Sequence, residues 1–192
     1  MTAAIILAGG RASRLDGADK AAVEIGGRPL IDAAFAAVSG ASPVIAVGPE
    51  SVTRNGVTVV REDPPFGGPV AGIHAALGHL DTVGAPTETW LLACDLPRAE
   101  LIVAQLHDVP IPEDADGVVL VDADGREQWL AGRYRVASLR ASLDGLPDVR
   151  DVAVRRLLAP LNLHTVTDRI GATLDLDTWA DVNSYRNQED PV

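Results

Sequence analysis

Residues Ala4-Ile5-Ile6-Leu7-Ala8 and Trp90-Leu91-Leu92-Ala93-Cys94 form two short runs in which every side chain is apolar. A strand that is apolar on both faces belongs in a sheet that helices cover on both sides. The first strand is expected from Ala3, and four more runs look like strands, at residues 44–47, 57–60, 118–121 and 129–133. Helical stretches alternate with them, at residues 30–38, 70–80, 100–107, 136–143, 152–158 and 178–186. This alternation predicts an α/β fold with a mainly parallel sheet.

The 192 residues carry 27 acidic and 16 basic side chains, which gives a formal net charge of -11. A chain of this length is predicted to form one domain, residues 1–192. The acidity argues against binding to nucleic acid or to an acidic membrane surface through a positive field. Lys20 is the only lysine, and the other 15 basic residues are arginine. The position of Lys20 is therefore of special interest.

The apolar run near the N-terminus stops at Gly9-Gly10, which is too short for a signal-peptide core or a membrane span. The single cysteine, Cys94, excludes an intrachain disulfide and is predicted to be a small buried apolar side chain. Cys94 and the four histidines show no zinc-ligand spacing. These features predict a cytoplasmic location.

Ligands of parallel α/β sheets bind beyond the carboxyl ends of the strands, so the loop after the first strand is a candidate site. Gly9-Gly10 lets the backbone approach a ligand closely, and Arg11, Arg14 and Lys20 supply charge that suits a triphosphate. The alternative is an ordinary tight turn followed by a solvated, charged loop. Neither the dinucleotide-binding pattern Gly-x-Gly-x-x-Gly nor a P-loop occurs.

Two more strand ends carry carboxylates. Asp95, at the end of the strand at 90–94, would either bind Mg²⁺ or cap the helix that follows. Asp175 and Asp177 share one face of an extended segment, so one would complete a two-carboxylate Mg²⁺ site while the other caps the helix near Thr178.

Other segments leave two interpretations open. Residues 67–72, Gly-Gly-Pro-Val-Ala-Gly, form either a close-approach substrate loop or a flexible connection. Asp124-Gly125-Arg126 is predicted to be a hairpin tip. On the strand after it, Arg133 and Arg135 would either meet an anionic second substrate or lie on a solvated strand edge.

Taken together, these segments resemble a known family. Leu7-Ala8-Gly9-Gly10, Arg14, Lys20 and Gly27-Arg28-Pro29-Leu30 match the nucleotidyltransferase signature LAGG-x3-R-x5-K…G-x-PL. The resemblance continues in the same order through residues 62–63 (Glu-Asp), 68–73 (Gly-Pro-Val-Ala-Gly-Ile), 94–97 (Cys-Asp-Leu-Pro) and 175–178 (Asp-Leu-Asp-Thr). Over nearly the whole chain it is a resemblance to the MobA-type molybdenum cofactor guanylyltransferases. It implies a single-domain, Rossmann-like (GT-A-like) three-layer sandwich.

The resemblance also implies a reaction, the transfer of GMP from MgGTP to the terminal phosphate of molybdopterin or its molybdenum form, with release of pyrophosphate. It implies transient contact with enzymes that deliver the pterin or accept the product. The implied catalytic residues are Arg14, Lys20 and Asp95, and the implied Mg²⁺ ligand is Asp95, which we expect Asp177 to assist. The implied nucleotide contacts are Leu7, Ala8, Gly9, Gly10, Lys20, Asp63 and Asp95.

Two departures from the family pattern keep alternatives open. Asp175-Leu176-Asp177-Thr178 stands where the family commonly has Asn-x-Asn-Thr, and it also resembles the related cytidylyltransferases, so CTP is an alternative substrate. Trp129-Leu130-Ala131 replaces a commoner proline-containing stretch beside the acceptor site. A non-catalytic nucleotide-binding accessory protein is the third possibility, although intact Arg14, Lys20 and Asp95 argue against it.

Overall fold

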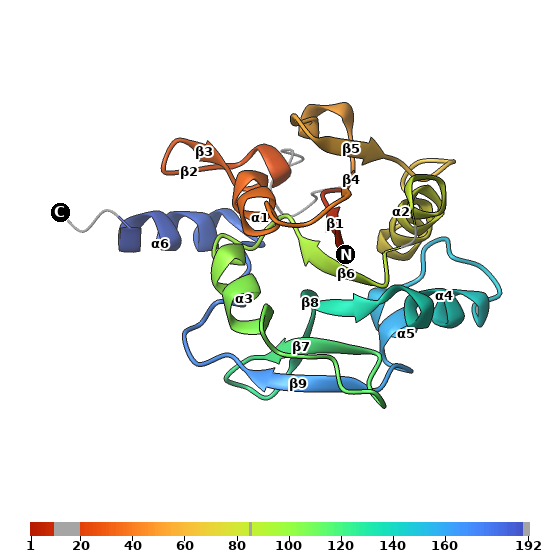
Figure 1. Cartoon of the computed structure of the whole chain (residues 1–192). Coiled ribbons are helices and arrows are strands. Elements are labelled where there is room, and N and C mark those ends of the chain that lie inside the picture. The colour runs from red at the N-terminus through yellow and green to blue at the C-terminus, as the bar shows by residue number, and fades with distance from the viewer. Residues whose placement is uncertain (10–19, 85, 190–192) are drawn as a thin grey trace.

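The computed structural model describes residues 1–9, 20–84 and 86–189. Seven strands form one sheet in the order β5-β4-β1-β6-β8-β7-β9 (Figure 1). Among these seven strands, β8 alone runs antiparallel to its neighbours, so the prediction of a mainly parallel sheet is confirmed. The strands are β1 (Thr2–Leu7), β4 (Val44–Val47), β5 (Val57–Val60), β6 (Glu88–Ala93), β7 (Gly117–Val121), β8 (Glu127–Arg135) and β9 (Leu163–Thr167).

Helices cover both faces of this sheet, as the apolar strands require. The helices α1 (Ile31–Ala37) and α3 (Ala99–Leu106) lie on one face (Figure 1). The opposite face is covered by α2 (Pro69–Val83), α4 (Val136–Asp144) and α5 (Val154–Leu158). Alternate residues of β1 enter the two cores, Ala4 and Ile6 on the side of α1 and α3, Ala3, Ile5 and Leu7 on the other. The predicted three-layer sandwich is therefore confirmed.

A third, smaller apolar cluster lies beside the sheet, and we call it the satellite core. It joins the hairpin of β2 (Glu24–Ile25) and β3 (Arg28–Pro29) to α6 (Trp179–Glu189) (Figure 1). Its buried side chains are Val23, Leu30, Leu176, Val182 and Tyr185. Because Val23 follows Lys20 closely and Leu176 separates Asp175 from Asp177, the satellite core fixes two candidate site segments against each other.

The predicted strands and helices all occur, with ends that shift by no more than three residues. The hairpin tip at Asp124-Gly125-Arg126 is confirmed between β7 and β8, where Gly125 has a φ of 78°. Pro29, a residue typical of the first turn of a helix, pairs instead with Glu24 in the β2–β3 hairpin. No described helix has the length and apolar character needed to cross a membrane.

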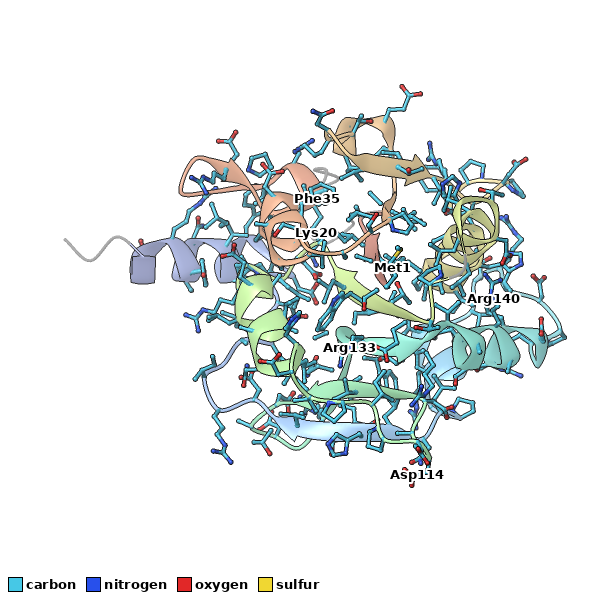
Figure 2. All side chains as sticks on the ribbon, viewed as in Figure 1. Met1, Lys20, Phe35, Asp114, Arg133 and Arg140 are labelled. Atoms are coloured by element: carbon cyan, nitrogen blue, oxygen red, sulfur yellow. The ribbon has the colours of Figure 1, made fainter. Side chains whose placement is uncertain are left out.

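Both interpretations of Arg133 and Arg135 are wrong. Strand β8 lies inside the sheet between β6 and β7, so Arg133, which is labelled in Figure 2, is only 8% exposed. Its guanidinium group stacks over the ring of Trp90 at 5.3 Å. The two guanidinium groups donate to backbone carbonyls of the segment after α3, those of His107 and Val109 from Arg133 and those of Ile111, Pro112 and Ala115 from Arg135. These arginines hold that segment to the sheet.

Candidate active site

The carboxyl ends of β1, β4 and β6 form the floor of the candidate site. Backbone hydrogen bonds continue past the ends of the strands, from Ala8 N to Val47 O at 2.8 Å and from Cys94 N to Leu7 O at 3.0 Å. A Cβ atom on Gly48 would lie 3.2 Å from the backbone of Ala8, so the floor is closely packed. Leu7, Ala8 and Gly9 thus lie at this edge, whereas Gly10 and Arg14 lie outside the described residues.

Lys20 joins two acidic segments that are far apart in the sequence. It begins the short 3-10 helix η2 (Lys20–Ala22), and its Nζ lies 2.5 Å from Asp95 Oδ2 and 2.5 Å from Asp177 Oδ1 (Figure 2 marks Lys20). Asp95 follows β6, and Asp177 lies between β9 and α6. The structure therefore brings together three of the residues expected at the site.

The charges of this cluster are strongly coupled. Burial lowers the pKa of Lys20, but the attraction of Asp95 and the hydrogen bonds to both carboxylates outweigh it and raise the pKa. Burial raises the pKa of Asp175, and repulsion from Asp177 and Asp95 raises it further. Three carboxylates thus lie within electrostatic reach of one another around one ammonium group.

One carboxylate oxygen of Asp95 is able to accept a ligand. Its Oδ1 atom is buried and has no hydrogen-bond partner among the described residues. An unpartnered buried carboxylate oxygen costs free energy, and an oxygen ligand of this kind suits Mg²⁺. The described residues contain no cluster of three or more metal-ligating side chains. Asp95 and Asp177 bring two carboxylates together, which fits the usual Mg²⁺ site, where one or two protein carboxylates are completed by phosphate oxygens and water.

The alternative capping roles of the aspartates are not observed. Arg98 is the N-cap residue of α3, and no side chain caps the helix, so Asp95 does not cap it. Helix α6 is capped by Thr178 and Asp181, whose side chains each accept a hydrogen bond from the backbone N–H of the other. Neither Asp175 nor Asp177 is needed for that cap.

Leu176 orients the two aspartates beside it. Residues 173–178 do not pair with any described strand. Instead, the side chain of Leu176 is buried in the satellite core, and its backbone N–H donates to Asp95 O at 3.1 Å. This contact ties the Asp175–Asp177 segment directly to the end of β6.

Asp168 is a second residue that holds this segment, and no sequence motif pointed to it. It is 8% exposed, and its carboxylate accepts hydrogen bonds from the backbone N–H and the hydroxyl of Thr173 and from the N–H of Ile170. Gln105 of α3 donates to it as well. Burial acts to raise the pKa of Asp168, but these hydrogen bonds prevail and lower the pKa to about 2.

We expect Asp168→Ala to destabilise the protein by about 2 kcal/mol at pH 7, the value that follows from a pKa lowered from 3.8 to about 2. The folded pKa lies below the unfolded one, so this stabilisation is complete above about pH 4 and is lost as the pH falls toward 2. Urea unfolding of the wild type and the variant at pH 7 and pH 3 measures it, and the difference should fall to about half at pH 3. Asp144→Ala, an exposed change on α4, is the control. A difference independent of pH would contradict the assignment.

Asp63 lies apart from the cluster of Lys20, Asp95 and Asp177. It lies exposed after β5, and three strand spacings, about 14 Å, separate β5 from β6. The segment that follows it is held in place. Gly67 N donates to Glu62 Oε1 at 3.2 Å, and Asp151 N donates to Gly67 O at 2.7 Å. Residues 69–72 also form the start of α2, so the interpretation of residues 67–72 as merely a flexible connection is wrong.

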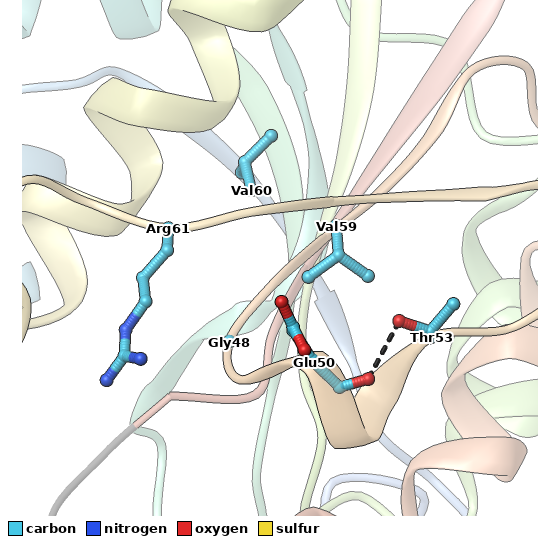
Figure 3. A pocket seen from close by; sticks show the side chains of 6 residues that line it. All are labelled: Gly48, Glu50, Thr53, Val59, Val60 and Arg61. Carbon is cyan, nitrogen blue, oxygen red and sulfur yellow. Dashed lines mark hydrogen bonds between the residues drawn. The ribbon is translucent and has the colours of Figure 1, made fainter.

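A cavity of about 820 Å³ lies at the carboxyl ends of β4 and β5 (Figure 3). Its lining combines small and apolar groups with two charged side chains, Glu50 and Arg61. The 3-10 helix η3 (Glu50–Val52) supplies one wall, where Thr53 Oγ1 donates to Glu50 O at 2.7 Å. Sequence analysis missed Glu50, although Gly48-Pro49-Glu50 directly follows a predicted strand. The complete lining is Gly48, Glu50, Thr53, Val59, Val60 and Arg61.

Fold and site together define an α/β protein with a carboxylate–ammonium cluster and a cavity along one edge of a mainly parallel sheet. The family model of the MobA-like NTP transferase domain matches residues 4–167. The chain belongs to this family. That match contains Lys20, the cavity and Asp95, but it ends before Asp177.

Individual relatives agree with this assignment. The chain is 30% identical over 195 residues to the molybdenum cofactor guanylyltransferase of Photobacterium profundum, covering 96% of this chain and 95% of the relative. It is also 30% identical over 132 residues to the protein of that name from Vibrio parahaemolyticus, but there it spans only 65% of the relative's length. The crystal structure of molybdopterin-guanine dinucleotide biosynthesis protein A from Archaeoglobus fulgidus superimposes with a TM-score of 0.69, at 19% identity and 98% coverage of both chains. That likeness concerns the fold.

Proposed function

We propose that this chain is a nucleotidyltransferase that transfers GMP from MgGTP to the terminal phosphate of molybdopterin or of its molybdenum form, with release of pyrophosphate. The observation that carries the proposal is the meeting of Lys20, Asp95 and Asp177 at the edge where parallel α/β sheets bind ligands. Family membership and the names of the relatives support the reaction class. A cytoplasmic location, and transient contacts with enzymes that supply the pterin or take the product, belong to the same proposal.

The proposed reaction is an in-line displacement at the α-phosphorus. A terminal phosphate oxygen of the acceptor is already anionic at neutral pH, so it needs no strong general base. It forms the new O–P bond as the bond from the α-phosphorus to the bridging oxygen breaks and pyrophosphate leaves with the electron pair. The demands on the protein are alignment and neutralisation of charge.

The residues of the site divide these tasks. Asp95 and Asp177 would hold Mg²⁺, which neutralises charge on phosphate oxygens when bound. Lys20, together with Arg14, would offset the charge that develops on pyrophosphate. The backbone of residues 7–10 and the carboxylate of Asp63 would contact the nucleoside.

The cavity beside β5 suits the base. A carboxylate such as that of Glu50 can accept hydrogen bonds from both N1–H and the 2-amino group of guanine, whereas the corresponding edge of cytosine offers one amino donor and an acceptor nitrogen. Glu50 and Asp95 follow strands that are two spacings apart, about 10 Å, so a base and its α-phosphate can reach both ends of the site. Glu50 therefore favours GTP over CTP in this proposal.

We expect Glu50→Gln to weaken binding of MgGTP by about tenfold or more, because hydrogen bonds to a charged group contribute about 1.5–3 kcal/mol. Binding of MgCTP should stay the same or improve. Calorimetric titration with GTP, ITP and CTP measures the ratios, and ITP, which lacks the 2-amino group, should lose less than GTP. Glu100→Gln, an exposed change in the first turn of α3, is the matched control. An unchanged ratio of GTP to CTP affinity would remove Glu50 from base recognition.

Nucleotide binding tests the choice of substrate. The proposal predicts that MgGTP raises the melting temperature more than MgCTP or MgATP does. A larger shift with MgCTP would favour a cytidylyltransferase, the alternative that Asp175-Leu176-Asp177 suggests. Binding of GTP without pyrophosphate release in the presence of molybdopterin would point to a non-catalytic accessory protein.

A further inference from the structure

We infer that the Lys20 ammonium group is the resident cation of the carboxylate pair in the nucleotide-free protein, so that a divalent metal enters this pair together with a nucleotide and poorly without one. The inference rests on the proposed function, because it assigns the two carboxylates to the metal. It adds that the same lysine holds the metal position while no nucleotide is bound.

The geometry around Nζ carries this inference. One ammonium group lies 2.5 Å from Asp95 Oδ2 and 2.5 Å from Asp177 Oδ1, so it bridges oxygens from two separate segments. A divalent cation that bridged the same two oxygens would have to occupy the same space. Metal and ammonium therefore exclude each other between these atoms.

The surroundings explain why a cation is needed there. Leu176 N donates to Asp95 O, and Leu176 is buried in the satellite core, so the Asp177 segment cannot easily move away from Asp95. The two carboxylates, 17% and 40% exposed, would repel each other without a positive charge between them. Lys20 supplies that charge from within the chain.

A nucleotide changes the balance because it offers Lys20 another anionic partner. The lysine side chain is a flexible stem with a compact charge, so it can turn from the carboxylates to phosphate oxygens without a change of fold. The vacated position then faces Asp95 Oδ2 and Asp177 Oδ1, and the buried Asp95 Oδ1 adds a further oxygen. By thermodynamic reciprocity, metal and nucleotide each increase the affinity for the other by the same factor.

The test is Mn²⁺ binding to the nucleotide-free protein, measured by electron paramagnetic resonance of the free ion and by calorimetry. Lys20→Met, which keeps the length of the stem and removes the charge, should bind Mn²⁺ about tenfold or more tightly than the wild type, within the usual range of coupling between sites. A non-hydrolysable GTP analogue should reduce that difference, because Lys20 has then left the carboxylates in the wild type. Adding Asp95→Asn to Lys20→Met should abolish the gain.

A control variant distinguishes the direct contact of Lys20 with the two carboxylates from an effect of the protein's net charge. Arg98→Met removes a positive charge three residues from Asp95, where Arg98 contacts Gly171 O and the ring of Tyr185. It should leave Mn²⁺ affinity within about twofold of the wild type, since a separated charge near the surface is screened. Lys20→Gln provides a second variant if Lys20→Met unfolds, as judged by circular dichroism.

The outcomes separate this inference from the proposed function. If nucleotide-free Lys20→Met and Lys20→Gln bind Mn²⁺ no more tightly than the wild type, Lys20 is not the resident cation, even if the wild type transfers GMP. Equal gains in Arg98→Met and Lys20→Met would also overturn it, because the effect would then be one of net charge. A specific gain in the Lys20 variants of a protein that transfers no GMP would support the resident cation and refute the proposed reaction.

Discussion

Lys20→Ala is expected to lower kcat for GMP transfer by about 100-fold or more at saturating MgGTP, the typical effect of removing a preorganised group that stabilises charge in a transition state. Lys20 is half-buried and already close to two carboxylates that are assigned to the metal, so its ammonium can reach phosphates held there. The contact should strengthen as negative charge develops on the leaving pyrophosphate. Single-turnover measurements at saturating substrate give the rate of the chemical step.

Lys20→Arg is the informative companion variant. It keeps the charge, but its planar guanidinium is wider than a compact ammonium and fits poorly between two oxygens at 2.5 Å from one atom. We expect it to recover only part of the lost rate. Unchanged turnover in Lys20→Ala, with the variant folded and saturated, would show that Lys20 has no catalytic role.

Asp95→Asn should raise the Mg²⁺ concentration needed for half-maximal activity by more than tenfold. Removing the negative charge of a carboxylate ligand weakens the binding of a hard cation. The effect should be large because Asp95 is the more buried of the two acidic partners of Lys20 and has one buried oxygen without a partner among the described residues. Titration of activity with Mg²⁺, at fixed saturating GTP, measures this requirement.

The matching control is Asp144→Asn, an exposed change on α4 that removes the same charge. It should leave the Mg²⁺ titration unaltered. Asp177→Asn should resemble Asp95→Asn but with a smaller shift, since Asp177 is more exposed. If the titration of Asp95→Asn coincided with that of the wild type, Asp95 would not be a metal ligand.

The parts of the fold that sequence analysis predicted are those governed by local pattern. Uniformly apolar runs identified β1 and β6, because a strand covered on both faces must be apolar on both. Strand β9 was missed because it is the edge strand beside β7, and the exposed side chains of His164, Thr165 and Thr167 give it no apolar run. Strands β2 and β3 have two residues each and depend on packing against α6, which lies at the other end of the chain.

The residues of the candidate site likewise differ in whether a local sequence pattern reveals them. Lys20 and Asp95 stand out because each follows a buried strand in a recognisable motif. Asp168 and Leu176 do not stand out in the sequence. Asp168 acts through a loop that folds back onto its carboxylate, and Leu176 acts through the satellite core. For Arg133 the error was the reverse, because a structural residue was considered for ligand binding. The sequence alone does not distinguish an arginine that binds backbone carbonyls inside the protein from one that binds a ligand.

The structure explains why most basic residues of the chain are arginines and only one is a lysine. Several arginines, among them Arg133, Arg135 and Arg140, donate to backbone carbonyls, a task for which a planar group with several donors is suited. The single lysine occupies a position where oxygens of two separate carboxylates, Asp95 and Asp177, converge on one cation. A compact charge on a flexible stem suits a group that must exchange partners during binding.

The most direct test of the central claim is a panel of nucleotides with molybdopterin as acceptor, followed by pyrophosphate release and by the mass of the product. We expect GTP with Mg²⁺ to release one pyrophosphate for each molybdopterin consumed and to yield a product heavier by one GMP unit. Lys20→Ala and Asp95→Asn should both lose this activity. Release with CTP instead of GTP, or no release with any nucleotide from a folded protein that binds GTP, would contradict the central claim.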